Sequence, residues 1–262
     1  MLIEANGIKI HCEVSGKEQA PVVVLSHSLA CSMLMWHPQL DVLEPHFRVV
    51  RYDTRGHGGS DAPPAPYRLQ QLVDDAIGIL DELGCDRVHW VGLSMGGMIG
   101  QGLALSHPDR IDHLVLADTA AIIPDDAQPI WQERIDAVLK EGLQVVADAT
   151  LERWFTPNFL KQRSAVIDQI RQQILATPVS GYVGCSEAIR RLNYLDRLPA
   201  VQAATLIMVG ADDPGTPVAA AEAMHAQIKD SQLVVIPDAA HLCNIEQAQT
   251  FNDNLITFLR KG

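Results

Sequence analysis

The stretch HWVGLSMGGMIGQGLALSH, residues 89–107, decides the fold of this protein. Its first part is an apolar run typical of a strand buried on both faces, and its second part reads as a helix. Ser94 stands between them, with Gly92 and Gly96 two residues away on either side. A serine on so sharp a strand-to-helix turn adopts a strained backbone, so its neighbours at those two positions must be very small. The stretch therefore predicts that Ser94 presents its Oγ at a helix N-terminus as a nucleophile.

A serine nucleophile needs a base and an acid from elsewhere in the chain. The hydroxyl is weakly reactive until a base removes its proton, and a carboxylate must orient that base. In folds with this kind of turn the chain order is serine, acid, histidine. Asp213 follows one predicted strand and His241 follows the next, and α/β proteins build their sites at the carboxyl ends of strands. We therefore predict His241 as the base and Asp213 as the acid, with Asp212 and Asp118 as alternatives for the acid.

Backbone N–H groups are expected to hold the oxyanion that forms at the substrate carbonyl. At least two such donors are needed. One is the N–H of Met95, the residue after the nucleophile. The second should come from the loop after the strand VVVLSH, where the N–H of Leu29 is our candidate.

Short apolar runs alternate with amphipathic helices over most of the chain. Apolar residues in 69–83 recur with a spacing close to 3.6, which is typical of a helix with one buried face. Such alternation is typical of an α/β fold with a mostly parallel sheet covered by helices. The predicted strands are 8–14, 22–27, 48–53, 89–94, 113–118, 205–210 and 232–238.

The alternation stops after about residue 121, and the next segment is helical only. Pro157 and Pro178 punctuate this segment. Because strands precede and follow it, we interpret it as a lid inserted into one core rather than as an independent domain. The predicted core is 1–121 and 195–262, the lid is 122–194, and the helices within the lid are 127–141, 142–154, 158–176 and 179–191.

The composition argues against several classes of partner. The 262 residues carry a formal net charge of −12, whereas binding to nucleic acid or to an anionic membrane needs a basic footprint. The first ten residues, MLIEANGIKI, lack the basic and apolar regions of a secretory signal, and no run reaches the roughly 18 apolar residues of a membrane span. We therefore expect a cytoplasmic protein that binds neither nucleic acid nor membrane.

Cysteines and histidines are frequent, but their spacing is uninformative. The five cysteines are odd in number and scattered without a C-x-x-C pair, as expected of reduced and mostly buried thiols. The ten histidines form no recognisable metal-binding spacing such as H-E-x-x-H. We predict no structural or catalytic metal.

Several further motifs accompany the turn at Ser94. DTRGHGGS (53–60) is similar to the R-G-x-G-x-S turn of the α/β-hydrolase superfamily, which the sequence resembles along its entire length. Other distinctive motifs are SHSL (26–29) followed by Met35-Trp36, WQERI (131–135), WFT (154–156) and GYVGC (181–185). Through these motifs the sequence is similar, within that superfamily, to 3-oxoadipate enol-lactonases, although that family commonly has an asparagine where His27 stands. The resemblance implies a mostly parallel eight-stranded sheet flanked by helices, with an inserted helical lid.

The resemblance implies hydrolysis of a small unsaturated lactone that bears an acetate side chain, with no cofactor. Ser94 would open the ring to an acyl-enzyme, and water activated by His241 would release 3-oxoadipate. Because this substrate is an anion and the protein is acidic, a cation must bind the carboxylate. We expect Arg134 in that role, with Arg190 and Arg191 as rivals.

Two tryptophans complete the expected site. Trp131 and Trp36 are predicted to wall the pocket, and aromatic packing without catalytic meaning is an equal alternative for both. Other functions that fit the residues are those of a different carboxylesterase, a cofactor-free perhydrolase or a non-catalytic receptor of the same fold. The sequence does not determine the oligomeric state, and a homo-oligomer is one of the possibilities.

Overall fold

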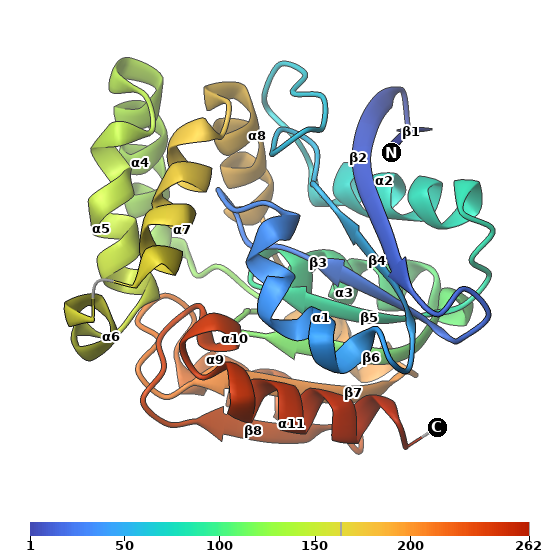
Figure 1. The fold of residues 1–262 in the computed structure, drawn as a ribbon. Helices are drawn as coiled ribbons and strands as arrows, with labels where there is room; N and C mark the ends of the chain where they lie inside the picture. The colour runs from blue at the N-terminus through green and yellow to red at the C-terminus, as the bar shows by residue number, and fades with distance from the viewer. Residues whose placement is uncertain (163, 262) are drawn as a thin grey trace.

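An eight-stranded sheet forms the centre of the protein (Figure 1). The computed structural model describes residues 1–162 and 164–261. The strand order is β1-β2-β4-β3-β5-β6-β7-β8; the β1–β2 and β2–β4 pairs are antiparallel, and the other pairs are parallel. The strands are β1 Leu2–Ala5, β2 Ile8–Gly16, β3 Val22–Ser26, β4 Arg48–Tyr52, β5 Val88–Leu93, β6 Ile111–Ala117, β7 Ala204–Gly210 and β8 Gln232–Ile236.

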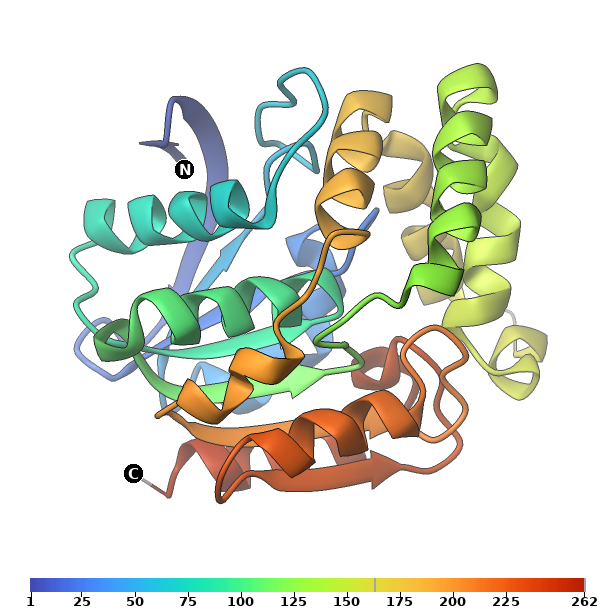
Figure 2. The same ribbon diagram turned by 180° about the vertical axis from the view of Figure 1, so that it is seen from behind.

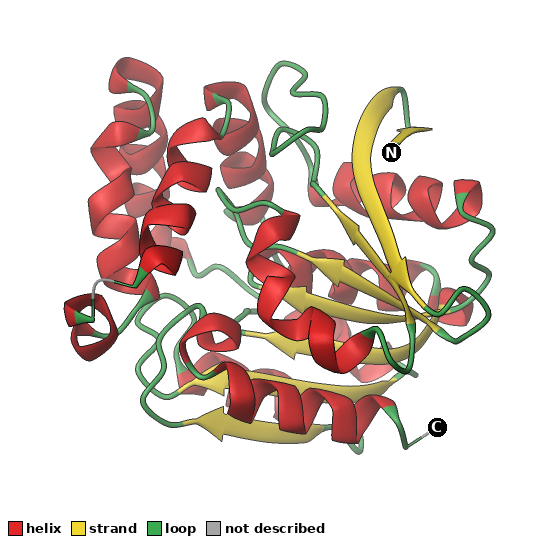
Figure 3. Ribbon diagram, in the orientation of Figure 1, coloured by secondary structure: helices red, strands yellow, loops and turns green. Residues whose placement is uncertain are grey.

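Helices cover both faces of the sheet and also form a block beside it. In Figure 1, α1 and α11 lie in front of the sheet, and the view from behind in Figure 2 shows α2, α3 and α9 on the other face. Helices α4 to α8 stand together on the side to which the strand arrows point (Figure 3). The helices are α1 His37–Leu43, α2 Leu69–Glu82, α3 Met95–Ser106, α4 Gln128–Glu141, α5 Gln144–Trp154, α6 Pro157–Lys161, α7 Ala165–Ala176, α8 Val179–Ile189, α9 Val218–Gln227, α10 Cys243–Glu246 and α11 Ala248–Leu259.

Burial follows the patterns that predicted these elements. All six residues of β5 are buried, as a central parallel strand covered on both faces requires. Helix α2 instead buries a stripe that includes Leu69, Leu72 and Leu80, which faces the sheet. The α/β-hydrolase fold with a mostly parallel eight-stranded sheet is therefore confirmed.

The structure differs from the prediction in two places. Strand β1 was not among the predicted strands, because its four residues at the sheet edge are too few to show an alternation. The predicted helix 158–176 is divided into α6 and α7. Ser164 begins the second helix, since its Oγ accepts a hydrogen bond from the N–H of Val166 at 3.4 Å. Residue 163 lies outside the described residues.

The two ends of the lid are tied together where they leave the core. Ile122 and Asn193 form an isolated antiparallel bridge. Beside it, the N–H of Tyr194 donates to the carbonyl of Ala121 at 2.7 Å. The two ends of the helical segment that we interpret as a lid therefore meet at one point, shortly after the end of β6.

Two further features concern the whole described chain. Within residues 1–162 and 164–261, no helix is both long and apolar enough to cross a membrane. All five cysteines are unpaired and buried, which agrees with the reduced thiols that the sequence predicts.

Candidate active site

Ser94 occupies a strained turn between β5 and α3. Its φ of 54° and ψ of −114° are rare for a residue with a side chain. A Cβ on Gly92 would lie 2.1 Å from the carbonyl oxygen of Gly96, and a Cβ on Gly96 would lie 2.0 Å from the carbonyl oxygen of Ser26. Both glycines are therefore required by close backbone approach, as the motif predicts.

Hydrogen bonds from the neighbouring strand hold this turn in place. The N–H of Ser94 donates to the carbonyl of Ala117 at 2.8 Å. The hydroxyl of Thr119 donates to the carbonyl of Ser94 at 2.7 Å. The strain at Ser94 is thus maintained by the end of β6, which leaves its side chain at the N-terminus of α3.

Asp213 and His241 are directly hydrogen-bonded. Nδ1 of His241 lies 2.7 Å from Oδ2 of Asp213, and both side chains are buried. A carboxylate only accepts hydrogen bonds, so Nδ1 carries the proton and Nε2 keeps its lone pair. The carboxylate is fixed further by the hydroxyl of Thr216 at 2.6 Å and the N–H of Gly215 at 2.7 Å. This arrangement fixes the orientation of the His241 ring and leaves Nε2 able to accept a proton.

Charge and burial act in opposite directions on this pair. Burial lowers the pKa of His241, but the charge of Asp213 and its hydrogen bond outweigh burial, and the net shift is upward from 6.5. For Asp213, burial raises the pKa, and the charge and hydrogen bond of His241 bring it below its usual value. Asp213 is therefore ionised at neutral pH.

Strand register places Ser94, Asp213 and His241 beyond the carboxyl ends of neighbouring parallel strands. Leu93 pairs with Ala117, and Ala117 pairs with Met208, so β5, β6 and β7 end level with one another. Among the described residues, Ser94 Oγ makes no hydrogen bond to His241. Such bonds are often long before substrate binds and shorten in the reactive complex.

The two alternative acids do not contact His241. Asp212 is exposed, and its carboxylate takes no part in the hydrogen bonds of the site. Asp118 is buried at the end of β6, where its Oδ1 accepts from the N–H of Gly210 at 2.7 Å. Burial, and then the charge of Asp213, raise the pKa of Asp118 to about 7. Asp118 therefore joins the ends of β6 and β7 but does not orient the histidine.

The two expected oxyanion donors have free N–H groups. Within the described chain, neither Leu29 nor Met95 donates a backbone hydrogen bond. The contact of Gly96 with Ser26 brings the start of α3 against the end of β3, and Leu29 lies three residues beyond Ser26. Both N–H groups are therefore available to a substrate oxygen at this end of the sheet.

Two buried histidines fix the loop that carries Leu29. Nε2 of His57 accepts from the N–H of Ala30 at 2.9 Å, and Nε2 of His27 accepts from the N–H of Thr54 at 2.8 Å. Each can accept only as a neutral ring. Burial keeps both rings neutral because it lowers the pKa of His57 to about 3 and also lowers that of His27. The DTRGHGGS motif thus supports the loop that carries Leu29, a role that the sequence analysis did not assign to it.

The cations of the lid separate into two groups. Arg190 and Arg191 both pair with Glu187, each at 3.3 Å. Arg134 and Arg153 have no carboxylate partner within the described residues, and the guanidinium of Arg134 lies 5.6 Å from the ring centre of Trp131. Burial, and then the charge of Arg134, lower the pKa of Arg153.

The sequence analysis missed Arg153 and quoted Trp154 only as part of the WFT motif, without a role in the site. The Trp154 ring stacks on His241 with centroids 6.0 Å apart, and the charge of Arg153 also acts on that histidine. Both follow from the end of α5 lying over the site, which no local pattern indicates. A groove of about 800 Å³ borders Arg153, but neither Ser94 nor His241 lines it.

The two predicted wall tryptophans differ in position. Trp131 is partly exposed and packs beside Arg134. Trp36 is fully buried and packs against Phe251 of α11, with ring centroids 6.3 Å apart. Trp36 is therefore part of the core beside α11.

Comparisons with known proteins show the family to which this fold belongs. The α/β hydrolase fold family matches residues 21–248. A 3-oxoadipate enol-lactonase from Acinetobacter baylyi is 34% identical, over 95% of this chain and 92% of that protein. The crystal structure of the enol-lactonase from Burkholderia xenovorans LB400 is 36% identical, with a TM-score of 0.96 and full coverage of both chains. A putative carbamate hydrolase, RutD of Yersinia enterocolitica, is 29% identical over 95% of this chain and 92% of that protein. The chain therefore belongs to the α/β hydrolase fold family, and within it to the esterase and lactonase type of hydrolase.

Proposed function

We propose that this protein hydrolyses a small anionic enol-lactone, of the 3-oxoadipate type, through Ser94, His241 and Asp213. The observation that carries the proposal is the 2.7 Å hydrogen bond between His241 and Asp213, at the edge of the sheet where Ser94 occupies its strained turn. The similarity to enol-lactonases over nearly the whole chain supports the lactone as substrate.

The residues supply each step of such a reaction. Ser94 Oγ attacks the lactone carbonyl while Nε2 of His241 takes its proton. The N–H groups of Leu29 and Met95 stabilise the oxyanion, and Asp213 stabilises the imidazolium. Collapse of this intermediate breaks the ring C–O bond, and His241 gives its proton to the departing enolate oxygen; the resulting enol relaxes to a ketone. A water activated by His241 then attacks the acyl-enzyme, releases the dicarboxylate and restores Ser94.

The anionic side chain of the lactone needs a cation near this site. Arg134 is our candidate, and the structure adds Arg153, because neither has a carboxylate partner among the described residues while Arg190 and Arg191 share Glu187. Two neighbouring cations without an anion are a favourable place for a carboxylate, which a guanidinium can bind with two hydrogen bonds.

A comparison of charged and neutral substrates tests this proposal. Arg134→Ala and Arg153→Ala should raise KM for the enol-lactone by about 10- to 150-fold, the value of a hydrogen bond to a charged group, and change kcat less. Hydrolysis of neutral p-nitrophenyl acetate should be nearly unchanged. Arg191→Ala is the matched control, since this exposed arginine already pairs with Glu187. Equal losses on both substrates would show that these arginines support the lid and do not bind the carboxylate.

A carbamate hydrolase or a plain carboxylesterase is the second candidate. Similarity to RutD proteins favours the first of these, and both could use the same three residues. A panel of enol-lactone generated in the assay, simple esters and a small carbamate separates them by kcat/KM. A higher kcat/KM for the carbamate or the esters than for the lactone would replace the lactonase proposal, and no turnover of any member would favour a binding protein.

A further inference from the structure

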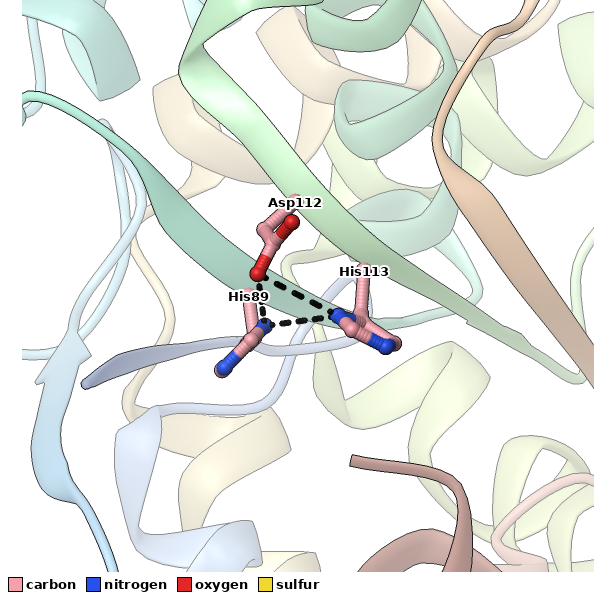
Figure 4. A group of neighbouring side chains, drawn as sticks. All are labelled: His89, Asp112 and His113. Atoms are coloured by element: carbon pink, nitrogen blue, oxygen red, sulfur yellow. Dashed lines mark hydrogen bonds and ion pairs between the residues drawn. The ribbon is translucent and has the colours of Figure 1, made fainter. Parts of the chain in front are cut away.

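A second group of polar residues lies at the amino ends of β5 and β6, whereas Ser94 follows the carboxyl end of β5. His89 is the second residue of β5, and Asp112 and His113 are the second and third residues of β6 (Figure 4). His89 precedes Ser94 by five positions, which is roughly 17 Å at the rise of a β-strand. The reaction proposed above therefore makes no use of this group.

An irregularity in the strand pairing brings the three side chains together. Val88 pairs with Ile111, but Trp90 pairs with Leu114, so one residue of β5 faces two residues of β6. This is a β-bulge, and a bulge redirects side chains that would otherwise alternate between the two faces. Asp112 and His113 can thus both turn towards His89, as Figure 4 shows.

Three potential ligand atoms converge at this bulge. The Nδ1 atoms of His89 and His113 are 3.1 Å apart, and Oδ2 of Asp112 lies 3.6 Å from the first and 3.4 Å from the second. A point equidistant from the three atoms lies about 2.0 Å from each of them, which is the length of a zinc–nitrogen or zinc–oxygen bond. Ligands of a tetrahedral zinc at such distances are about 3.3 Å apart, close to the separations found here.

The surroundings of the group also leave a route for a cation. Both rings are almost completely buried, while the side chain of Asp112 is 37% exposed and leaves a route from solvent. The other oxygen of Asp112 accepts from Arg87 at 2.9 Å, which orients the carboxylate.

We propose that His89, Asp112 and His113 form a binding site for one divalent transition-metal ion of the zinc class, with a solvent molecule as fourth ligand. Nothing in the spacing of the histidines predicted it, because the ligands come from two strands and are aligned by a bulge. The metal would join the amino ends of β5 and β6 and would stabilise the fold without taking part in catalysis. A hydrogen bond between two neutral imidazoles is the alternative, and it requires no metal.

Zinc titration of the chelator-treated protein tests the site. Calorimetry at neutral pH should show one equivalent bound per chain. Free zinc at 100 times Kd should raise Tm by about 5 °C for a chain of this length. Cobalt(II) should give the visible absorption of a tetrahedral complex, and kcat/KM on an ester should be the same with and without zinc.

Variants separate this site from incidental binding to other histidines. Loss of a residue that only orients a metal ligand costs about 10- to 100-fold in affinity. His113→Gln and Asp112→Asn each remove a ligand, so they should weaken zinc binding by more than that. Asp112 is partly exposed, so its variant keeps the test open if His113→Gln does not fold. Arg87→Gln should weaken binding by about 10- to 100-fold, because Asp112 loses the partner that orients its carboxylate. His225→Gln, which removes an imidazole from α9, is the control and should leave Kd unchanged.

Two results would overturn the proposal. One is the absence of saturable binding by the parent chain. The other is binding that His113→Gln and Asp112→Asn leave unchanged, which would assign the metal to another place and these residues to a hydrogen-bonded pair.

Discussion

Replacing Gly96 by alanine should separate catalysis from folding at the turn that carries Ser94. The new Cβ would lie 2.0 Å from the carbonyl oxygen of Ser26, whereas ordinary contacts begin at 3.4 Å. The start of α3 and the end of β3 must therefore move apart by about 1.4 Å. The N–H of Met95 belongs to the first of these segments and Leu29 follows the second, so the gap between the two oxyanion donors should widen.

The size of the effect follows from that displacement. A misplacement of about 1 Å in a reactive geometry costs on the order of 10²-fold, and loss of one oxyanion donor costs about 10²- to 10³-fold. We expect kcat to fall by this amount, with KM less affected, while overpacking lowers the free energy of unfolding by about 1–3 kcal/mol. Hydrolysis of p-nitrophenyl acetate and of the enol-lactone measures the loss of kcat, and thermal unfolding measures the loss of stability.

A second glycine of the same helix provides the matched control. A Cβ on Gly102 would lie 2.6 Å from Cγ2 of Val73, a side chain that can adjust, and it is remote from the turn. Gly102→Ala should therefore lose some stability and little activity. Gly96→Ala with the kcat of the parent chain would refute the reasoning, because the donors would then tolerate the displacement or play no part in the reaction.

Three further predictions concern the proposed triad. Ser94→Ala should lower kcat by about 10⁶-fold with an unchanged fold by circular dichroism, and residual activity near that of the parent would reject Ser94 as nucleophile. Asp213→Asn should lower kcat by about 10⁴-fold, since the imidazole loses its correct tautomer and orientation. Asp212→Asn and Asp118→Asn should lower kcat far less. A loss at Asp118→Asn as large as that expected for Asp213→Asn would show that the acid follows β6 and not β7. Only neutral His241 can act as base, and Asp213 raises its pKa above 6.5, so kcat/KM should fall as the pH drops through a value above 6.5. In Asp213→Asn this fall should move to lower pH, and a pH profile identical to that of the parent would contradict the assignment.

The sequence by itself predicted the fold and the three residues of the proposed triad. The turn at Ser94 could be recognised because its steric demands fall on residues two positions away, Gly92 and Gly96. Asp213 and His241 could be placed because each directly follows a strand, and parallel strands end at the same edge of the sheet. In all these cases the relevant neighbours are close in the chain, so a local pattern carries the information.

Tertiary structure alone decided which distant side chains meet. It left the neighbouring cations Arg134 and Arg153 without carboxylate partners among the described residues, and it placed Trp36 in the core. These outcomes depend on how the lid packs over the sheet, and helical periodicity does not specify that packing.

The group formed by His89, Asp112 and His113 illustrates the same limit. The residues are ordinary in the sequence, since adjacent strand positions normally point to opposite faces. Only the register shift between β5 and β6 turns Asp112 and His113 to one side, opposite His89. Register depends on contacts between whole strands, so a local sequence pattern encodes the turn at Ser94 but cannot encode this group.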